Sequence, residues 1–300
     1  MGEEESLKRV KLTVAYDGTN YCGWQQQKNG TAVENVLNRA LSELTGEQIE
    51  VIGASRTDSG VHALGNVAVF DTESGIPADK FSYAVNQKLP PDIRAVKSCE
   101  CAPDWHPRRQ EGSKIYEYKI FNERIQNPLQ RLYAHHCHFP LSLGDMRAAA
   151  EYLIGEHDFT SFSNPDSQVL KNGGSAVREI YDITILVEHS RRSGRGLPEE
   201  QIETDAERFE ETGAKPRGYY GMITIKISGS GFLYNMVRII AGTLLEAGMG
   251  HYEPAHVREI LEARDRKLAG PTAEAKGLCL MKLEYRDQGL AGGENVAGDE

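Results

Sequence analysis

The sequence is poor in cysteine, in tryptophan and in long apolar runs. Its 300 residues include only two tryptophans and five scattered cysteines: Cys22, Cys99, Cys101, Cys137 and Cys279. This small, odd number predicts no disulfide framework. No run of about 18 apolar residues is present, so we expect no transmembrane helix. The acidic N-terminus lacks the apolar stretch of a signal peptide, and we therefore expect a cytoplasmic protein without a membrane partner.

Positive charge is also in deficit. The chain has 34 lysines and arginines against 44 aspartates and glutamates, a formal net charge of −10. This balance excludes a histone-like or polybasic protein that binds nucleic acid by bulk charge. Much of the acidity lies in residues 199–211 and at the two chain ends. The rest of the chain is close to neutral, which is compatible with a locally basic cleft.

Length and composition predict a globular protein with two domains or one large one. Hydrophobic residues make up 39% of the chain and charged residues 26%, enough apolar material for a core. At roughly 150 residues per domain, two domains are expected. Pro103, Pro107 and Gly112 punctuate a polar stretch near the middle. We expect an acidic tail over 1–7, one half over 8–105, a second over 106–286 with a surface insertion at 189–218, and a disordered tail over 287–300.

Hydrophobic periodicity predicts an α/β (α+β) protein. In the first half, alternation from Lys8 to Asp17 indicates a strand, and an apolar stripe over 33–44, ended by Gly46, indicates a helix. Strands near 47–54, 65–70 and 93–101 and a helix between Pro77 and Leu89 complete a β-α-β-β-α-β order, typical of ferredoxin-like and RNA-recognition folds. In the second half we expect strands at 114–121, 131–139, 178–188, 219–228 and 279–285, and helices at 142–154, 232–247 and 255–264.

The segment Gly53–Ala63 is the strongest candidate site. It joins two predicted strands and contains Gly, Ser, Arg, Asp and His within eleven residues, a composition common in functional loops. A guanidinium at Arg56 would lower the pKa of the Asp58 carboxyl, and an ionised carboxylate can act as nucleophile or base. The alternative is a glycine-rich turn with a capping Asp and a solvated Arg. His62 could join a triad, but no serine elbow accompanies it.

Two other polar segments carry weaker signals. The run His135–His138 resembles a metal cluster, but neighbours in a strand point to opposite faces, so only His135 and Cys137 could share a side. We therefore expect no metal. Gly229-Ser230-Gly231 precedes a predicted helix, so it could bind a phosphate at the helix N-terminus or form a plain turn.

The candidate loop also carries a family resemblance. Arg56-Thr57-Asp58-Ser59-Gly60-Val61-His62-Ala63 resembles the RTDAGVHA signature of the tRNA pseudouridine synthase A family. Further segments resemble that family's motifs in the same order: Tyr16–Gln27, Asn86–Pro90, His106–Arg108, Lys114–Tyr118, His157–Phe162, Gly231–Arg238 and Gly277–Leu280. Serine replaces a usual glycine at 55 and a usual alanine at 59, and asparagine a usual glutamine at 66. None of these departures removes Arg56 or Asp58.

The resemblance implies a fold, a reaction and a partner. The fold would be that of pseudouridine synthases, two ferredoxin-like halves with mainly antiparallel sheets around a central cleft. The reaction would convert uridine to pseudouridine in the anticodon arm of tRNA, at tRNA positions 38–40. Members of the family use no cofactor and no metal and form homodimers, so we expect the same here. The role of the 189–218 insertion is not implied.

The resemblance also implies site residues. Asp58 matches the catalytic aspartate, Tyr116 an aromatic residue against the target base, Arg238 an arginine near the aspartate, and Leu278 an apolar pocket residue. Arg56 could occupy the space of a flipped-out uridine or hold a phosphate. The carboxylate could attack C1′, add at C6 or remove the C2′ proton, and the sequence leaves these routes open. Tyr116 is a candidate base for the final C5 proton.

Local basic residues suggest where RNA would lie. Lys8 and Lys11 fall on the first strand, and Arg108, Arg109 and Lys114 at the start of the second half. Our hypothesis is that they line an RNA groove, although alternate strand residues face opposite sides and some could simply be solvated. A catalytically idle RNA-binding protein on the same scaffold is one alternative. A carboxylate hydrolase of nucleosides or glycosides is another, but it normally needs a second acid near Asp58.

Overall fold

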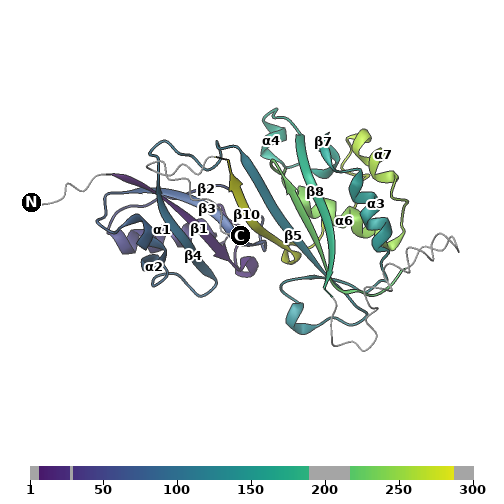
Figure 1. Cartoon of the computed structure of the whole chain (residues 1–300), viewed down its shortest axis with the longest axis horizontal. Coiled ribbons are helices and arrows are strands. Elements are labelled where there is room, and N and C mark those ends of the chain that lie inside the picture. Colours follow the sequence, from purple (N-terminus) through teal and green to yellow (C-terminus); the bar gives the residue numbers. More distant parts are fainter. Residues whose placement is uncertain (1–6, 28–29, 189–216, 287–300) are drawn as a thin grey trace, which may run out of the picture. The chain divides into compact units, whose positions relative to one another are not determined.

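The computed structural model describes residues 7–27, 30–188 and 217–286. The chain forms two compact units (Figure 1): the first runs to Ser113 and resumes at Leu280, and the second is Lys114–Cys279. The chain therefore passes from one unit to the other within two strands. The predicted acidic and disordered tails, Leu7 apart, and nearly all of the predicted surface insertion lie outside the described residues.

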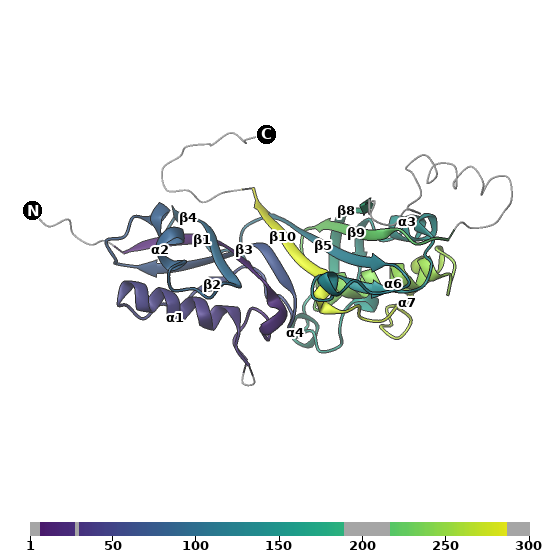
Figure 2. The ribbon, with the colours of Figure 1, turned by 90° about the horizontal axis from the view of Figure 1, so that it is seen from below.

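The first unit has the predicted β-α-β-β-α-β order. Its elements are β1 (Lys8–Tyr16), α1 (Val33–Thr45), β2 (Ile52–Gly53), β3 (His62–Thr72), α2 (Phe81–Val85) and β4 (Ile93–Cys101). The sheet order is β4-β1-β3-β10, where β10 spans Leu278–Tyr285, and β2 pairs with β3. Strand β1 is antiparallel to both of its neighbours. Figure 2 shows α1 running along one face of this sheet.

Sequence periodicity explains the best-formed elements of this unit. Val10, Leu12 and Val14 alternate along β1 and are completely buried, as a half-buried strand requires. The predicted stripe on α1 is buried from Val33 to Leu41, and its last member, Leu44, is half-buried. Gly46 ends that helix in the left-handed conformation, with φ +77°, which glycine adopts without steric cost.

The outer strand β4 is closed off by a side chain. Asn86 Nδ2 donates to the Ala95 carbonyl at 2.9 Å, and the Ala95 N–H donates to Asn86 Oδ1 at 2.8 Å. The asparagine amide thus takes the place of a neighbouring strand at one position. Such contacts blunt an exposed sheet edge, which would otherwise offer unpaired backbone groups.

The second unit contains further antiparallel strands and most of the helices. Its elements are β5 (Gly112–Asn122), β6 (His135–Cys137), α3 (Leu143–Glu151), β7 (Gly155–Asp158), α4 (Gln168–Lys171), β8 (Val177–Glu188), β9 (Gly221–Gly229), α6 (Met236–Met249) and α7 (His256–Ala263). The strand order is β5-β9-β8-β7, and β6 pairs in parallel with β5. Helix α6 is the centre of the core, since eleven of its fourteen residues are buried.

Several predicted elements differ from the structure for local reasons. The predicted strand 47–54 shrinks to β2, because the side chains of Ser42 and Asn38 accept the backbone N–H groups of Ile49 and Val51. The predicted strand 131–139 shrinks to β6. The predicted helix from 232 begins only at Met236, because Asn235 is left-handed, with φ +62°.

Three more differences concern short elements. Between Pro77 and Leu89 a 3-10 turn, Ala78–Lys80, precedes the five-residue helix α2. The predicted helix 142–154 ends at Glu151, and strand β7 follows it unpredicted.

Along the described chain, no helix combines the length and apolarity needed to cross a membrane.

Replacing Asn86 tests the closure of the β4 edge. Asn86→Ala removes both hydrogen bonds to Ala95, and we expect the free energy of unfolding in urea to fall by about 1–3 kcal/mol. The neighbouring exposed Gln87→Ala should change it by less than about 0.5 kcal/mol. Equal stability of the two variants would show that the asparagine does not support the strand.

Candidate active site

The loop that carries Asp58 rests on a buried hydrogen-bond network. The Tyr16 hydroxyl lies 2.7 Å from Thr57 Oγ1, and Asn66 Nδ2 donates to the Tyr16 oxygen at 3.2 Å. Asn66 also bonds both backbone groups of Ser55, donating to its carbonyl at 3.0 Å and accepting from its N–H at 3.2 Å. Ser55, Thr57 and Asn66 are all buried. Because buried polar groups are costly when unpaired, this network specifies one arrangement of the loop.

Three glycines allow a second chain segment to pack against the loop. A Cβ on Gly18 would lie 2.0 Å from the Val61 oxygen, and one on Gly53 would lie 2.1 Å from Trp24 Nε1. Gly23 has φ +105°, and its Cβ would lie 2.5 Å from the Thr57 oxygen. That same oxygen accepts the Trp24 N–H at 3.1 Å. The Tyr16–Gln27 motif is thus the support of the loop, and its glycines are required for contact.

Burial alternates along the loop that carries the two charged residues. Arg56 is exposed between the buried Ser55 and Thr57, and Asp58 is half-buried. The Val61 N–H donates to the Asp58 carbonyl at 3.1 Å, which closes a turn, and Gly60 takes φ +78° within it. The turn fixes the backbone of Asp58.

The family-atypical residues fit this backbone. Among the described residues only Asn235 and Arg264 combine a side chain with a positive φ, so Ser55 suffers no such strain. Asn66 is the centre of the buried network. His62 is buried as well, and its Nδ1 accepts the Gly18 N–H at 3.1 Å. This contact gives His62 a supporting role in the loop.

In the second unit, Tyr116 stands on β5 with its ring held by an aromatic contact. It is 8% exposed, and its ring meets that of Phe232 edge to face at 5.3 Å and 89°. This geometry is the favoured one for aromatic pairs. The ring orientation is therefore set by packing within the unit.

Arg238 and Leu278 are held by the same chain segment, residues 270–278. Arg238 Nε donates to the Ala273 carbonyl at 2.7 Å, and the Ala273 N–H donates back to the Arg238 carbonyl at 3.1 Å. Tyr118, whose pKa is raised by burial, donates its hydroxyl to the Glu274 carbonyl at 3.0 Å. Leu278, 5% exposed, follows directly at the start of β10. The segment thus fixes the Arg238 guanidinium and leads into Leu278.

The candidate residues are divided between the units. Asp58 and Arg56 belong to the first unit, and Tyr116, Arg238 and Leu278 to the second. Sequence reasoning did not single out Tyr16 and Asn66 as supports of the loop. A signal existed for Asn66, because it is a polar residue within the apolar run Gly65–Phe70, and such residues are buried only with partners.

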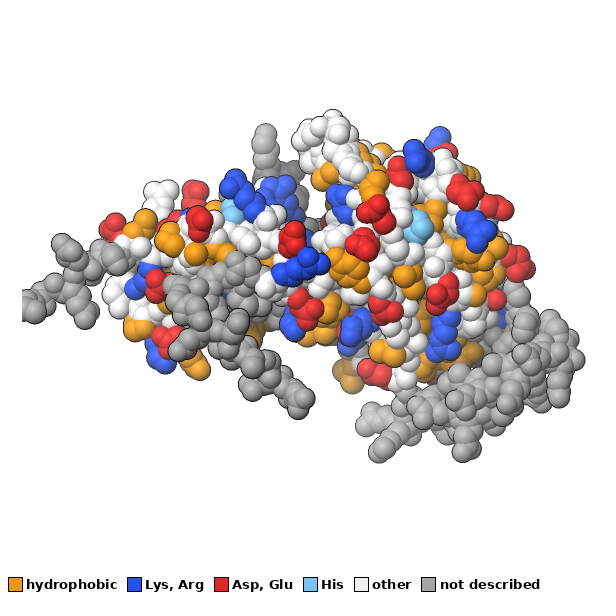
Figure 3. All heavy atoms as spheres, turned by 45° about the horizontal axis from the view of Figure 1, so that its top comes forward, with side chains coloured by type: hydrophobic (Ala, Val, Ile, Leu, Met, Phe, Trp, Pro, Cys, Tyr) orange, Lys and Arg blue, Asp and Glu red, His pale blue; other side chains and the backbone are white. Residues whose placement is uncertain are grey.

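The predicted RNA-contact residues differ in their surroundings. Lys8 donates to the Ser74 carbonyl at 2.6 Å, and Lys11 is 9% exposed with its ammonium 4.9 Å from the centre of the Trp105 ring. Arg108 and Arg109 are exposed, and Lys114 is half-buried. On the face drawn in Figure 3, basic and acidic side chains are interspersed. An RNA site on this face would therefore be built from local groups.

The histidine run does not assemble a metal site. His135 Nδ1 lies 3.0 Å from Glu274 Oε2, whereas His136 Nε2 lies 2.8 Å from the Glu123 carbonyl. Burial lowers the pKa of His135, and the Glu274 carboxylate opposes that shift. Nowhere in the described ranges do three or more His, Cys, Asp or Glu side chains form a group able to hold a metal ion.

Relatives match nearly the whole chain. The family model described as tRNA pseudouridine synthase matches residues 12–108 and 149–286. A protein of Acetivibrio thermocellus named tRNA pseudouridine synthase A is 41% identical over 279 residues, 93% of this chain and 100% of that protein. Proteins of the same name from Ruminiclostridium cellulolyticum and Clostridium acetobutylicum are 42% and 40% identical with the same coverage. The family-model match includes Asp58, Arg238 and Leu278, and Tyr116 lies between its two segments.

A pair of glycine variants tests how the loop is supported. Both Gly23 and Gly46 have positive φ, but a Cβ on Gly46 meets nothing within 4 Å. We expect Gly46→Ala to cost about 1 kcal/mol of stability, from the backbone conformation alone. Gly23→Ala should cost about 2–4 kcal/mol, because the Thr57 carbonyl must also move. Urea unfolding measures both, and equal losses would contradict a close contact at Gly23.

Proposed function

The chain belongs to the tRNA pseudouridine synthase family, and we propose that it converts uridine to pseudouridine in the anticodon arm of tRNA, with Asp58 as the catalytic carboxylate. The observation that supports this assignment most directly is the loop itself. A half-buried carboxylate stands on a fully hydrogen-bonded buried network. Preorganised groups of this kind are what catalysis requires.

The reaction needs no co-reactant. The N1–C1′ bond of the nucleoside breaks, the uracil turns, and a C5–C1′ bond forms. A proton leaves C5 and N1 acquires one, so atoms and charge balance. Because the uridine is stacked within RNA, it must first be flipped out. The enzyme must therefore supply a group that acts on the ribose or the base, a surface for the flipped base, and a proton acceptor.

We assign the first task to Asp58. Its carboxylate would attack C1′, add at C6, or remove the C2′ proton. Each route requires an ionised carboxylate in a fixed place, and the buried network provides that place equally well for all three. Arg56, exposed beside it, would fill the space that the uridine leaves or hold an adjacent phosphate.

The remaining roles fall to the second unit. The ring of Tyr116, oriented by Phe232, would pack against the target base, and its hydroxyl would accept the C5 proton. Arg238, fixed by Ala273, would take the part of the family's arginine near the catalytic aspartate, and Leu278 that of its apolar pocket residue. These roles need a set of residues that a catalytically idle RNA-binding protein would not need.

We rank the predicted RNA contacts by the exposure of their side chains. Lys11 is buried over the Trp105 ring and Lys8 is half-buried, so we give them a lesser part. Arg108 and Arg109 are exposed and are assigned as the principal RNA contacts, and the half-buried Lys114 remains a candidate contact. By resemblance to the family we also expect a homodimer that acts in the cytoplasm without cofactor or metal.

Replacing the carboxylate tests the catalytic assignment. Asp58→Asn keeps the shape of the side chain and removes its charge, so the rate of pseudouridine formation should fall by about a thousandfold or more. Asp79→Asn, an exposed aspartate of the same unit, is the control and should keep the wild-type rate. The measurement is chemical mapping of pseudouridine in an unmodified tRNA transcript. No mark with the wild-type protein would overturn the function, and an undiminished mark with Asp58→Asn would overturn the residue.

A second variant tests the proton acceptor. Tyr116→Phe preserves the ring that meets Phe232 and removes only the hydroxyl, so kcat should fall by about 10²-fold or more while tRNA affinity is retained. Tyr219→Phe loses a hydroxyl bound to the His138 carbonyl and should leave kcat unchanged. Single-turnover experiments measure the rate of each variant. A wild-type rate for Tyr116→Phe would show that another group accepts the proton.

A further inference from the structure

The turn Trp105–Arg109 is anchored to the core of the first unit. Trp105 is 3% exposed and belongs to a core cluster with Ala54, Val69 and Cys101. Its ring meets that of Tyr285 edge to face at 5.1 Å, and the Tyr285 hydroxyl donates to the Pro107 carbonyl at 3.1 Å. The side chains of the turn therefore project from a rigid base.

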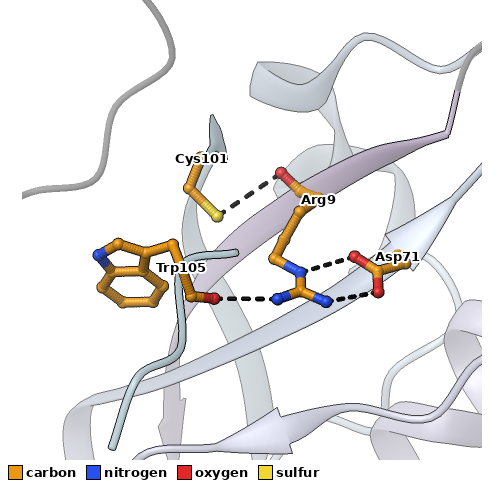
Figure 4. Close-up of polar contacts among 4 residues, drawn as sticks. All are labelled: Arg9, Asp71, Cys101 and Trp105. Atoms are coloured by element: carbon orange, nitrogen blue, oxygen red, sulfur yellow. Dashed lines mark hydrogen bonds and ion pairs between the residues drawn. The ribbon is translucent and has the colours of Figure 1, made fainter. Parts of the chain in front are cut away.

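An ion pair braces the same turn from β1. Figure 4 shows Arg9 bound through two nitrogens to the carboxylate of Asp71, both at 2.7 Å. The remaining terminal nitrogen donates to the Trp105 carbonyl at 3.1 Å. Because the paired guanidinium has a fixed orientation, it also fixes the backbone that leads into His106.

Three basic side chains project from this base within four residues. The Arg108 N–H donates to His106 Nδ1 at 3.2 Å, which makes Nδ1 the acceptor and leaves the imidazole proton on Nε2. The Arg109 N–H donates to the His106 carbonyl at 3.0 Å. Arg108 Nε donates to the Gly53 carbonyl at 2.7 Å, where the loop that carries Asp58 begins. The turn and the loop are thus tied together within the first unit.

The charges of this cluster repel one another. The pKa of His106 is lowered by burial and by the positive charges of Arg109, Arg108 and Arg9. The pKa of Arg108 is lowered by burial and by Arg56, with Glu34 acting in the opposite sense. Arg56, Arg108 and Arg109 are exposed, and none of them forms an ion pair with another described residue. Such a cluster gains stability when an anion enters it.

We propose that His106, Arg108 and Arg109, together with Arg56, form a preformed site for backbone phosphates of the RNA next to the target uridine. Arg109 and the His106 Nε2–H donate to phosphate oxygens. Arg108 spans from the Gly53 carbonyl to the phosphate, so the RNA backbone is aligned with the loop that carries Asp58. Phosphate contacts fix position and orientation without reading sequence. The identity of the ligand as tRNA rests on the proposed function.

The binding test compares arginines of equal charge. Arg109→Gln should weaken binding of an unmodified tRNA transcript by about 5- to 30-fold and reduce the slope of log Kd against log salt by about one. The control is Arg39→Gln, which removes one exposed arginine from α1 of the same unit. It should change neither quantity by more than about a factor of two. Equal effects of the two variants would overturn the site.

A second readout does not depend on activity. Entry of a phosphate among these cations must raise the pKa of His106 from its lowered value, so binding takes up a proton and tightens as the pH falls. NMR titration of the His106 imidazole, with and without saturating tRNA, should show this rise. His106→Gln should remove that part of the pH dependence of Kd. An unchanged His106 pKa in the complex would overturn the site.

The proposed function and the proposed phosphate site can be refuted independently. Binding with the predicted salt slope and His106 shift, but no pseudouridine, would refute the catalytic function and keep the phosphate site. Pseudouridine formation with Arg109→Gln indistinguishable from Arg39→Gln would keep the function and refute the site.

Discussion

The buried network of Tyr16, Thr57, Asn66 and Ser55 is the constraint on which the rest of the candidate site depends. It joins β1, β3 and the loop between β2 and β3 through hydrogen bonds among buried residues. Each of these groups would cost about 1–3 kcal/mol if left unpaired, so alternative loop conformations are unfavourable. The backbone position of Asp58 is therefore set by the fold.

The same principle recurs at the other candidate residues. Phe232 sets the ring of Tyr116, the Ala273 backbone sets Arg238, and Trp105 with Arg9 sets the turn that carries His106. Of these three side chains, Tyr116 is buried, and Arg238 and His106 are half-buried. Within each compact unit, the candidate side chains are therefore positioned by packing and hydrogen bonds.

The sequence predicted those elements whose burial is periodic. The bounds of strand β1, helix α1 and strand β4 were predicted within a residue or two. Alternating apolar residues in a strand and an apolar stripe on a helix both indicate which face is buried. Strand β2 was predicted too long, since nothing in the pattern shows that Asn38 and Ser42 capture the backbone groups of Ile49 and Val51. The late start of α6 reflects the left-handed Asn235, which no periodicity reveals.

The sequence named candidate residues for the site but did not show how the fold supports them. Spacing alone left Arg56 and Asp58 undecided between a turn and an active site, and the resemblance across ordered motifs favoured the latter. The sequence alone did not explain the glycines of the Tyr16–Gln27 motif. The fold explains them, because they contact Thr57 and Val61. Lys11, which read as a surface cation, packs over Trp105. Local sequence patterns do not predict long-range contacts of this kind.

The most direct test of the central claim is the rate of pseudouridine formation by Tyr16→Phe, measured in single turnovers alongside its tRNA affinity. This variant keeps the ring and deletes the oxygen that Thr57 and Asn66 share. If the buried network holds the catalytic loop, the rate falls about tenfold or more while the affinity stays within about threefold. A wild-type rate in a stably folded Tyr16→Phe protein would contradict the account.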